Sequence, residues 1–320
     1  MDFAAKVVAW QGAHGRHGLP WQATRDPYLV WLSEIMLQQT QVATVIPYYE
    51  RFLARFPDAA ALARASQDDV LRLWSGLGYY ARGRNLHAAA AEIRKSGFPR
   101  TAAEIERLPG VGRSTAAAIA VFAFGERTAI LDGNVKRVLA RCFNMDDEKA
   151  LWERAEALLP ENDIETYTQG LMDLGATVCT RANPSCGRCP LTDLCIARRR
   201  GWQERLPAKR ARRALPQKSV TWLVRRHEGK VFVERRPASG IWGGLWCFPA
   251  GMEKRGDRAL APIEHGFTHF RLRIRPVLRH VSRKGKAGSD RRWMSLGALE
   301  RAAVPAPVRT LIARLRESGR

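Results

Sequence analysis

The stretch Leu108-Pro109-Gly110-Val111-Gly112 decides how the first part of this chain is expected to fold. Upstream of it, Thr101 and Glu104 form a capping box, which begins a helix, and an apolar helix follows Arg113. Two glycines between two helices let backbone N–H groups face outward at a helix N-terminus, which suits a phosphate. The same turn is also common as a plain helix connector, so both interpretations are open on local grounds.

Around this turn, the spacing of apolar residues predicts two domains of different classes. Residues 1–197 show apolar positions three and four apart, broken by Pro or Gly, which predicts an all-helical domain. Residues 198–218 read as a basic linker. In residues 219–320 the apolar period changes to two, and a final helix is expected from about 307 to 317, so this smaller domain is predicted to be α+β.

The charge is strongly positive and unevenly spread. The chain carries a formal net charge of +22; residues 214–320 hold 23 Lys and Arg against 8 Asp and Glu, a net of +15. In that part Arg271, Arg273 and Arg275 alternate with apolar residues, which sets a row of arginines on one sheet face. A nucleic acid is the expected partner, although ribosome-associated or merely solubilising surfaces are also basic.

The length and the apolar runs predict a soluble protein. The longest apolar run, residues 116–124, is about half of a membrane span, and Asp2 stands where a signal peptide would be basic. We therefore expect a cytoplasmic protein that contacts no membrane. We also expect it to be a monomer.

Two carboxyl groups are candidates for chemistry. Asp132 precedes Gly133-Asn134 and is expected to cap a helix, where backbone N–H groups hold a carboxylate ionised. Glu34 shares its helix face with Val30 and Trp31, so burial should raise its pKa, although a single helical Glu is most often a solvated surface residue. One protonated acid and one carboxylate are what cleavage of a glycosidic bond requires.

Four of the six cysteines are clustered. They follow the pattern Cys-x6-Cys-x2-Cys-x5-Cys, and they are Cys179, Cys186, Cys189 and Cys195. In a cytoplasmic chain this indicates one S4 metal site, either zinc or an iron–sulfur cluster, which spacing alone does not decide. Cys142 and Cys247 are expected to be packing residues.

Taken together, these motifs resemble the endonuclease III superfamily of DNA glycosylases, whose helix-hairpin-helix clamps the DNA backbone. Residues 31–41 are similar, nearly residue for residue, to the segment that bears the acid in MutY-type adenine glycosylases. The resemblance implies that Glu34 protonates the leaving adenine and that Asp132 is the shared catalytic aspartate. It also implies that the four cysteines hold a [4Fe-4S] cluster.

The resemblance further implies a DNA interface in the helical domain. The residues expected in the adenine pocket or against DNA are Trp21, Gln39, Tyr79, Gly110, Gly112, Ser114, Asn134 and Lys136. Of these, Gln39 and Tyr79 match positions that insert into the duplex, although Tyr79 could also be a core aromatic. Ser114 stands where bifunctional relatives carry a Schiff-base lysine, so the enzyme is expected to be monofunctional.

In the second domain, residues 239–249 resemble the entry to a Nudix-like domain. No cluster of magnesium-binding carboxylates follows Gly251, so we expect a recognition module without hydrolase activity. The loop Phe267-Thr268-His269 matches a Phe-Ser-His loop, and the resemblance assigns contact with 8-oxoguanine to Thr268 and His269. Two departures are His17, where relatives have Lys or Arg, and a short segment at residues 252–265.

The sequence thus predicts an enzyme of base excision repair with a helical helix-hairpin-helix domain, an iron–sulfur loop and a smaller Nudix-like domain. Its expected substrate is double-stranded DNA with adenine opposite 8-oxoguanine or guanine, and its product an abasic site. Two alternatives are an endonuclease III-type glycosylase and lyase acting on oxidised pyrimidines, and a DNA-binding protein without catalysis. Ser114 and Glu34 count against the first, and intact Glu34 and Asp132 disfavour the second.

Overall fold

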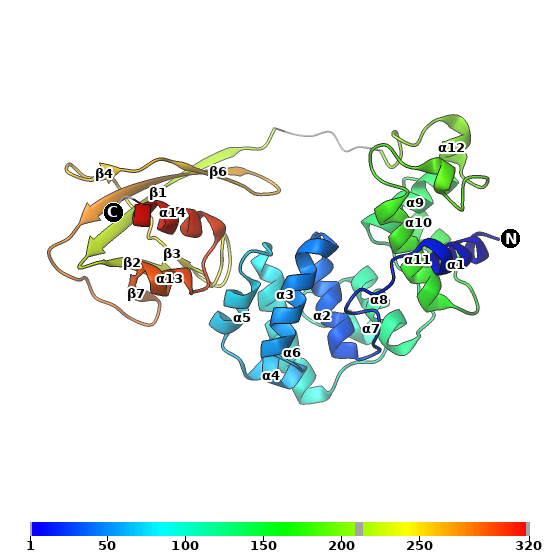
Figure 1. Ribbon diagram of the computed structural model, residues 1–320, viewed down its shortest axis with the longest axis horizontal. Coiled ribbons are helices and arrows are strands. Elements are labelled where there is room, and N and C mark those ends of the chain that lie inside the picture. The colour runs from blue at the N-terminus through cyan, green and yellow to red at the C-terminus, as the bar shows by residue number, and fades with distance from the viewer. Residues whose placement is uncertain (1, 209–213, 318–320) are drawn as a thin grey trace. The chain divides into compact units, whose positions relative to one another are not determined.

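The computed structural model describes residues 2–208 and 214–317, and these form two compact units (Figure 1). One unit contains the described residues of 1–63 and 88–211; the other contains those of 64–87 and 212–320. The first is helical, and the second combines a sheet with helices. The predicted order of a helical part followed by an α+β part is confirmed, while the boundaries at residues 197 and 219 stay a prediction.

Short helices account for the residues before 201. They are α1 (Phe3–His14), α2 (Pro27–Leu37), α3 (Val42–Arg55), α4 (Ala59–Arg64), α5 (Gln67–Trp74), α6 (Tyr80–Ser96), α7 (Ala102–Ile105), α8 (Arg113–Phe124), α9 (Gly133–Phe143), α10 (Glu148–Ala157), α11 (Ile164–Thr177) and α12 (Ile196–Arg200), with a 3-10 turn at Cys186–Arg188. Their starts follow the capping signals in the sequence. Asp26 caps α2 with Pro27 in the first turn, and the predicted box of Thr101 and Glu104 caps α7.

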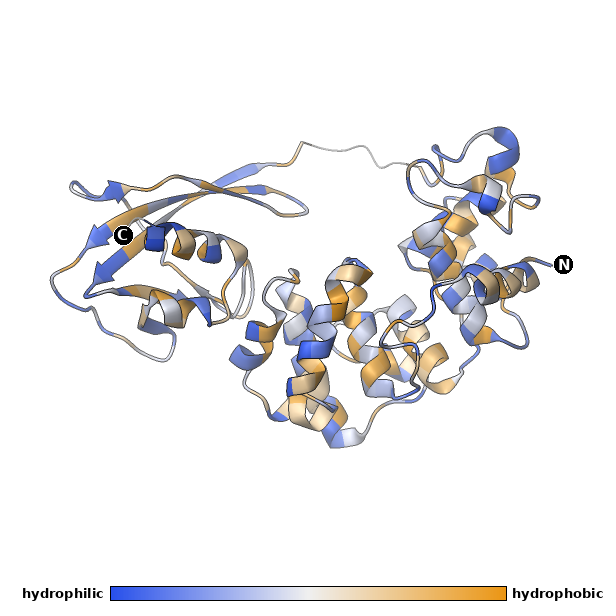
Figure 2. Cartoon of the chain, in the orientation of Figure 1, coloured by the Kyte–Doolittle hydropathy of each residue, from blue (hydrophilic) through white to orange (hydrophobic). Residues whose placement is uncertain are grey.

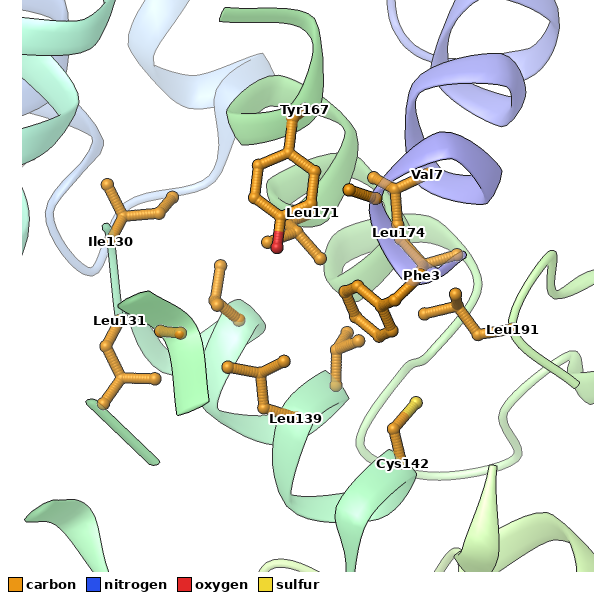
Figure 3. Close-up of a cluster of buried hydrophobic side chains, with 14 of the residues drawn as sticks. Phe3, Val7, Ile130, Leu131, Leu139, Cys142, Tyr167, Leu171, Leu174 and Leu191 are labelled. Atoms are coloured by element: carbon orange, nitrogen blue, oxygen red, sulfur yellow. The ribbon is translucent and has the colours of Figure 1, made fainter. Parts of the chain in front are cut away.

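Helices α1, α9 and α11 enclose a hydrophobic core beside the site (Figure 3). Phe3 and Val7 of α1 meet Leu171 and Leu174 of α11 in this cluster, and all four are buried. Helix α11 also approaches α9 closely at Gly175, where a Cβ would lie 2.5 Å from the Cβ of Asn134. A glycine is required there because any side chain would push α11 away from the N-terminus of α9.

The second unit contains a seven-stranded sheet in the order β3-β2-β1-β6-β4, with β5 on β6 and β7 on β2. The strands are β1 (Gln217–His227), β2 (Lys230–Arg235), β3 (Trp246–Cys247), β4 (Arg258–Ala259), β5 (Ile263–Gly266), β6 (Arg271–His280) and β7 (Arg291–Ser295), and the helices α13 (Leu296–Glu300) and α14 (Ala306–Glu317) follow. Strands β1 and β6 are parallel, and the other pairs are antiparallel. Buried side chains of β1, β2 and β6 pack with those of α14.

Local signals in this unit behave as expected. The predicted turn at Glu228-Gly229 has both residues at positive φ, 44° and 71°, as a two-residue hairpin requires. The final helix α14 matches the predicted one. The short segment of residues 252–265 contains β4 and the start of β5, and no helix is present in it.

The basic linker at residues 198–218 stays a prediction, and its ends overlap two regular elements. Helix α12 ends at Arg200 and β1 begins at Gln217, so both ends of the predicted linker 198–218 belong to regular elements. The basic run at 209–213 lies outside the described residues. Across residues 2–208 and 214–317, no helix combines the length and the apolar character needed to cross a membrane.

Candidate active site

Glu34 and Asp132 line one cavity of about 590 Å³ in the helical unit. Glu34 comes from α2, and Asp132 precedes the first residue of α9. Four of the other residues that the sequence placed in the pocket or against DNA also line this cavity, namely Trp21, Gln39, Ser114 and Asn134, whereas Gly110, Gly112 and Lys136 of the same unit do not. The sequence therefore predicted residues from four separate segments that the fold brings to one place.

The carboxyl of Glu34 lies on the apolar face of α2, as expected. Its helix neighbours Val30 and Trp31 are 2% and 0% exposed. Burial, and after it the negative charge of Asp132, raises the pKa of Glu34 to about 8. At neutral pH this group is therefore mostly protonated and can act as a proton donor.

Asp132 is held by donors on its own helix. Its Oδ1 accepts hydrogen bonds from the backbone N–H groups of Asn134 at 3.0 Å and Val135 at 2.8 Å, and its Oδ2 accepts one from the Asn134 amide at 3.2 Å. Burial raises the pKa of Asp132, and these hydrogen bonds and the charge of Arg137 oppose that rise. The predicted cap is confirmed, and it fixes the direction in which the carboxylate faces the cavity.

A chain of hydrogen bonds joins Asp132 to the cysteine-rich segment. The guanidinium of Arg137 donates to Asn134 Oδ1 at 2.8 Å, to the Gly175 carbonyl at 2.6 Å and to the Cys179 carbonyl at 2.6 Å. Asn134 in turn binds Asp132. The position of the carboxylate thus depends on how the segment at Cys179 is anchored.

The hairpin next to the cavity presents backbone donors. Gly110 has a φ of 79°, which favours glycine, and Gly112 precedes α8 with no side chain capping the first turn. A Cβ at Gly112 would meet nothing within 4 Å, so the surface is open there. In the first turn, the Ser114 hydroxyl accepts a hydrogen bond from the Leu131 N–H at 3.0 Å, which ties the hairpin to the residue before Asp132.

Two residues predicted to insert into DNA have unusual backbones. Gln39 and Tyr79 have φ values of 57° and 46°, in the left-handed region that only a few per cent of non-glycine residues adopt. Tyr79 is 47% exposed, and the loop before it is fixed by a hydrogen bond from the Trp74 indole N–H to the Gly78 carbonyl at 3.1 Å. Strained, exposed residues in well-anchored loops are typical of functional sites.

Sequence reasoning missed Arg16 and Gln169, which line the cavity, and Asp173, which binds both of them. Asp173 is fully buried on α11, and its carboxylate accepts hydrogen bonds from the Arg16 backbone N–H and side chain, both at 2.7 Å, and from the Gln169 amide at 2.8 Å. Gln169 lines the main cavity and a second one of about 460 Å³ that also reaches Glu34. The sequence offered one signal for this group: Asp173 stands among apolar residues of its helix, and a buried charge needs a partner.

His17 and Lys136 lie at the edges of this arrangement. His17 lines the second cavity, and its Nε2 is 3.1 Å from the Gln11 carbonyl oxygen. Lys136 forms an ion pair with Glu148 at 2.6 Å and does not line the cavity with Asp132. Any contact of Lys136 with DNA would therefore lie outside the cavity.

The four clustered cysteines line a separate cavity together with Val138, Arg141 and Cys142 of α9. The buried guanidinium of Arg141 lies against it and donates to the Cys179 sulfur at 3.3 Å and to the Thr180 carbonyl at 2.7 Å. Among residues 2–208 and 214–317, no three His, Cys, Asp or Glu side chains are close enough together to hold a single metal ion. The thiols thus surround a space and do not converge on one point.

In the second unit, Thr268 and His269 form the exposed tip of a tight loop between β5 and β6. The Phe267 N–H donates to the Phe270 carbonyl at 2.9 Å, and the two rings stack with centroids 4.4 Å apart. Trp242 packs against Phe267 at 5.6 Å. The loop is therefore closed by aromatic packing and presents a hydroxyl and an imidazole to solvent.

Comparison with known proteins agrees with this geometry. Residues 32–161 match the family described as HhH-GPD superfamily base excision DNA repair protein, and residues 220–314 match the NUDIX domain. The adenine DNA glycosylase of Buchnera aphidicola subsp. Acyrthosiphon pisum (strain APS) is 36% identical over 97% of this chain and 96% of its own length. The chain belongs to the adenine DNA glycosylases. Its predicted class of enzyme is therefore confirmed: it hydrolyses an N-glycosidic bond in base excision repair.

Solved structures support the fold of this adenine glycosylase. A thermostable thymine-DNA glycosylase is 29% identical with a TM-score of 0.58, covering 62% of this chain and 95% of its own. An endonuclease III in a non-covalent DNA complex is 20% identical with a TM-score of 0.55, covering 63% and 99%. Together with the two family matches, they confirm the predicted helix-hairpin-helix domain followed by a Nudix-like domain.

Proposed function

We propose that this glycosylase removes adenine paired with 8-oxoguanine, and also adenine paired with guanine, from double-stranded DNA. The observation that carries the mechanism is the cavity shared by Glu34, whose pKa is raised to about 8, and Asp132, which is anchored at the start of α9. One group is protonated and the other is oriented by fixed donors. We further propose that the enzyme acts as a monomer in the cytoplasm.

Glu34 acts as the general acid in this proposal. It donates its proton to a ring nitrogen of adenine while the bond from the base to the sugar carbon breaks and its electron pair leaves with the base. The carboxylate of Asp132 stabilises the positive charge that develops on the sugar until water attacks. Water supplies the oxygen of the abasic product, so no other reactant is required.

Ser114 makes the enzyme monofunctional. Its hydroxyl is engaged by the Leu131 N–H, and a hydroxyl cannot form the Schiff base that a lysine amine forms. Strand cleavage should therefore appear only after added alkali or heat. Efficient β-elimination at the same rate as base loss would assign the protein to the bifunctional glycosylases.

Adenine must leave the base stack to reach the cavity. Gln39 and Tyr79 are proposed to insert into the duplex when it does. Flipping exposes a gap and costs a few kcal/mol, which stacking with an aromatic ring offsets. Tyr79 offers an exposed ring on a loop whose backbone is fixed in advance. The hairpin of Gly110 and Gly112 would hold the adjacent phosphate through the open first turn of α8.

Thr268 and His269 are proposed to contact 8-oxoguanine. Both side chains are exposed at the tip of a loop that aromatic packing closes. A polar contact to a base is worth about 1–3 kcal/mol, so the double variant Thr268→Ala, His269→Ala should lose about tenfold or more of the preference for 8-oxoguanine over guanine. Unchanged discrimination at matched salt would place recognition elsewhere.

A [4Fe-4S] cluster is proposed on the four cysteines. They line one cavity, and thiolates spread around a space suit a cluster in which each binds a different iron. When bound, the cluster crosslinks the segment from Cys179 to Cys195 and so stabilises its fold. Arg141 and Arg137 already connect this segment to α9.

The test is a single-turnover assay with enzyme in excess over a duplex that carries one adenine opposite 8-oxoguanine. The proposal predicts free adenine and a strand break that depends on alkali. Glu34→Gln should slow release by on the order of a hundredfold or more while duplex binding is retained. Near-normal release by Glu34→Gln would contradict the assignment of the acid.

A further inference from the structure

The strand that leaves the Thr268–His269 loop carries an exposed row of arginines. Arg271, Arg273 and Arg275 of β6 are exposed, while Leu272 and Ile274 between them are buried. In Figure 2, β6 carries both hydrophilic and hydrophobic colours along its length. Because side chains alternate across a sheet, the buried set fixes the arginines on the opposite, solvent-facing side.

The neighbouring strands leave this face open. Strand β1 pairs Gln217, Ser219 and Thr221 with the three arginines in order, so only small or uncharged polar side chains flank them on that side. On the other side, β5 pairs Glu264 with Arg273 and Gly266 with Arg271. These partners define what we call the arginine face: the solvent side of β5, β6 and the first half of β1.

Among the described residues, one of the three arginines on the arginine face has a carboxylate partner. Glu264 is an acidic side chain on it, and its Oε1 lies 3.4 Å from Arg273 Nε, with both side chains about half exposed. Arg275 donates to the Thr221 hydroxyl at 3.4 Å. In the part of the chain that the structure describes, no carboxylate lies within 4.0 Å of Arg271 or Arg275.

The spacing of the row suits a phosphate backbone. Arginines two residues apart along a strand are separated by about 6.6 Å, so the three span about 13 Å. One DNA strand carries a phosphate about every 3.4 Å of helix axis, so this span covers about four phosphates. An exposed row of guanidinium groups flanked by Gln217, Ser219 and Thr221 leaves room for a duplex backbone to approach.

We propose that the arginine face binds the phosphate backbone of duplex DNA that flanks the mispair. That the bound DNA flanks the mispair rests on the proposed function, because the arginine face begins directly after the loop assigned to 8-oxoguanine. The occupant is a duplex backbone since the chain is a DNA glycosylase and the face is a row of like charge. The contact contributes affinity and register, and it carries no information about the base.

The test compares the full-length enzyme with the variant Arg271→Gln, Arg273→Gln, Arg275→Gln. Each lost phosphate contact should reduce the slope of log K against log salt by about 0.9, or by about 2.7 for three. Between 0.05 and 0.2 M salt, the wild-type affinity for a 30-base-pair duplex should therefore fall about 40-fold more than that of the variant. Single-turnover adenine release at saturating enzyme should be unchanged.

The matched control removes three exposed charges elsewhere in the same unit: Arg255→Gln, Arg283→Gln, Lys286→Gln. A loss of slope equal to that of the first variant would overturn the proposal, because net charge alone would then explain it. A wild-type slope in the arginine variant would also overturn it. The binding slopes are measured on any duplex, so they test the face even if adenine opposite 8-oxoguanine proves not to be the substrate.

Discussion

Raising the pH through 8 should stop adenine release by deprotonating Glu34. A carboxyl with the ordinary value of 4.5 would be protonated in only about 0.3% of molecules at pH 7, whereas one with a pKa of about 8 is protonated in about 90%. Burial on α2 therefore raises the population of the acid form about 300-fold at pH 7. Above pH 8 the rate should fall about tenfold per pH unit, since only the protonated enzyme can donate.

The assay is single-turnover release of adenine from a duplex with 8-oxoguanine opposite, between pH 6 and 9.5, at constant ionic strength and saturating enzyme. The phosphates of bound DNA add negative charge, so the break is expected at about 8 or above. Glu34→Gln is the control and should show a low, flat profile. A rate that already falls about tenfold per pH unit between pH 6 and 8, as for an ordinary carboxyl, would refute the reasoning.

Three further outcomes follow from the structure. Glu34→Gln should stabilise the fold at pH 8, because the raised pKa of Glu34 makes the wild type lose stability as the pH rises from 4.5 to about 8. The gain, up to several kcal/mol, would appear as an increase in the urea midpoint over that of the wild type that is larger at pH 8 than at pH 4.5. No such increase would contradict the burial of Glu34. Cys186→Ser should lose visible absorption and bound iron in purified protein, whereas wild-type protein with stoichiometric zinc would exclude the cluster. Tyr79→Ala should weaken duplex binding about tenfold or more and Tyr79→Phe should not, since stacking is worth about 1–3 kcal/mol; equal loss in both would show that the hydroxyl matters instead.

The fold was predictable where local signals were strong. Asp26 before Pro27, the capping box at Thr101 and the cap at Asp132 each mark the first turn of a helix, and the structure begins helices at those places. The change of apolar period near residue 219 marks the sheet correctly. Composition does not show where regular structure ends near the predicted linker, because Arg198–Arg200 is basic and yet helical in α12.

The site was predictable only where its residues carried a motif. Glu34 and Asp132 stand in recognisable segments, and the structure places both at one cavity. Gln169 and Asp173 could not be assigned, since their role depends on how α11 packs beside Arg16, a contact 157 residues away in sequence. Lys136 was included for its place in the motif near Asp132; the structure pairs it with Glu148, and its contact with DNA stays a prediction.

The most direct test of the central claim is the release of free adenine from two matched duplexes, one with adenine opposite 8-oxoguanine and one with adenine opposite guanine. Wild-type enzyme should release adenine from both and faster from the first, with strand breaks only after alkali, and Glu34→Gln should release it on the order of a hundredfold more slowly or worse. If wild-type enzyme binds both duplexes but releases adenine from neither, the account is contradicted.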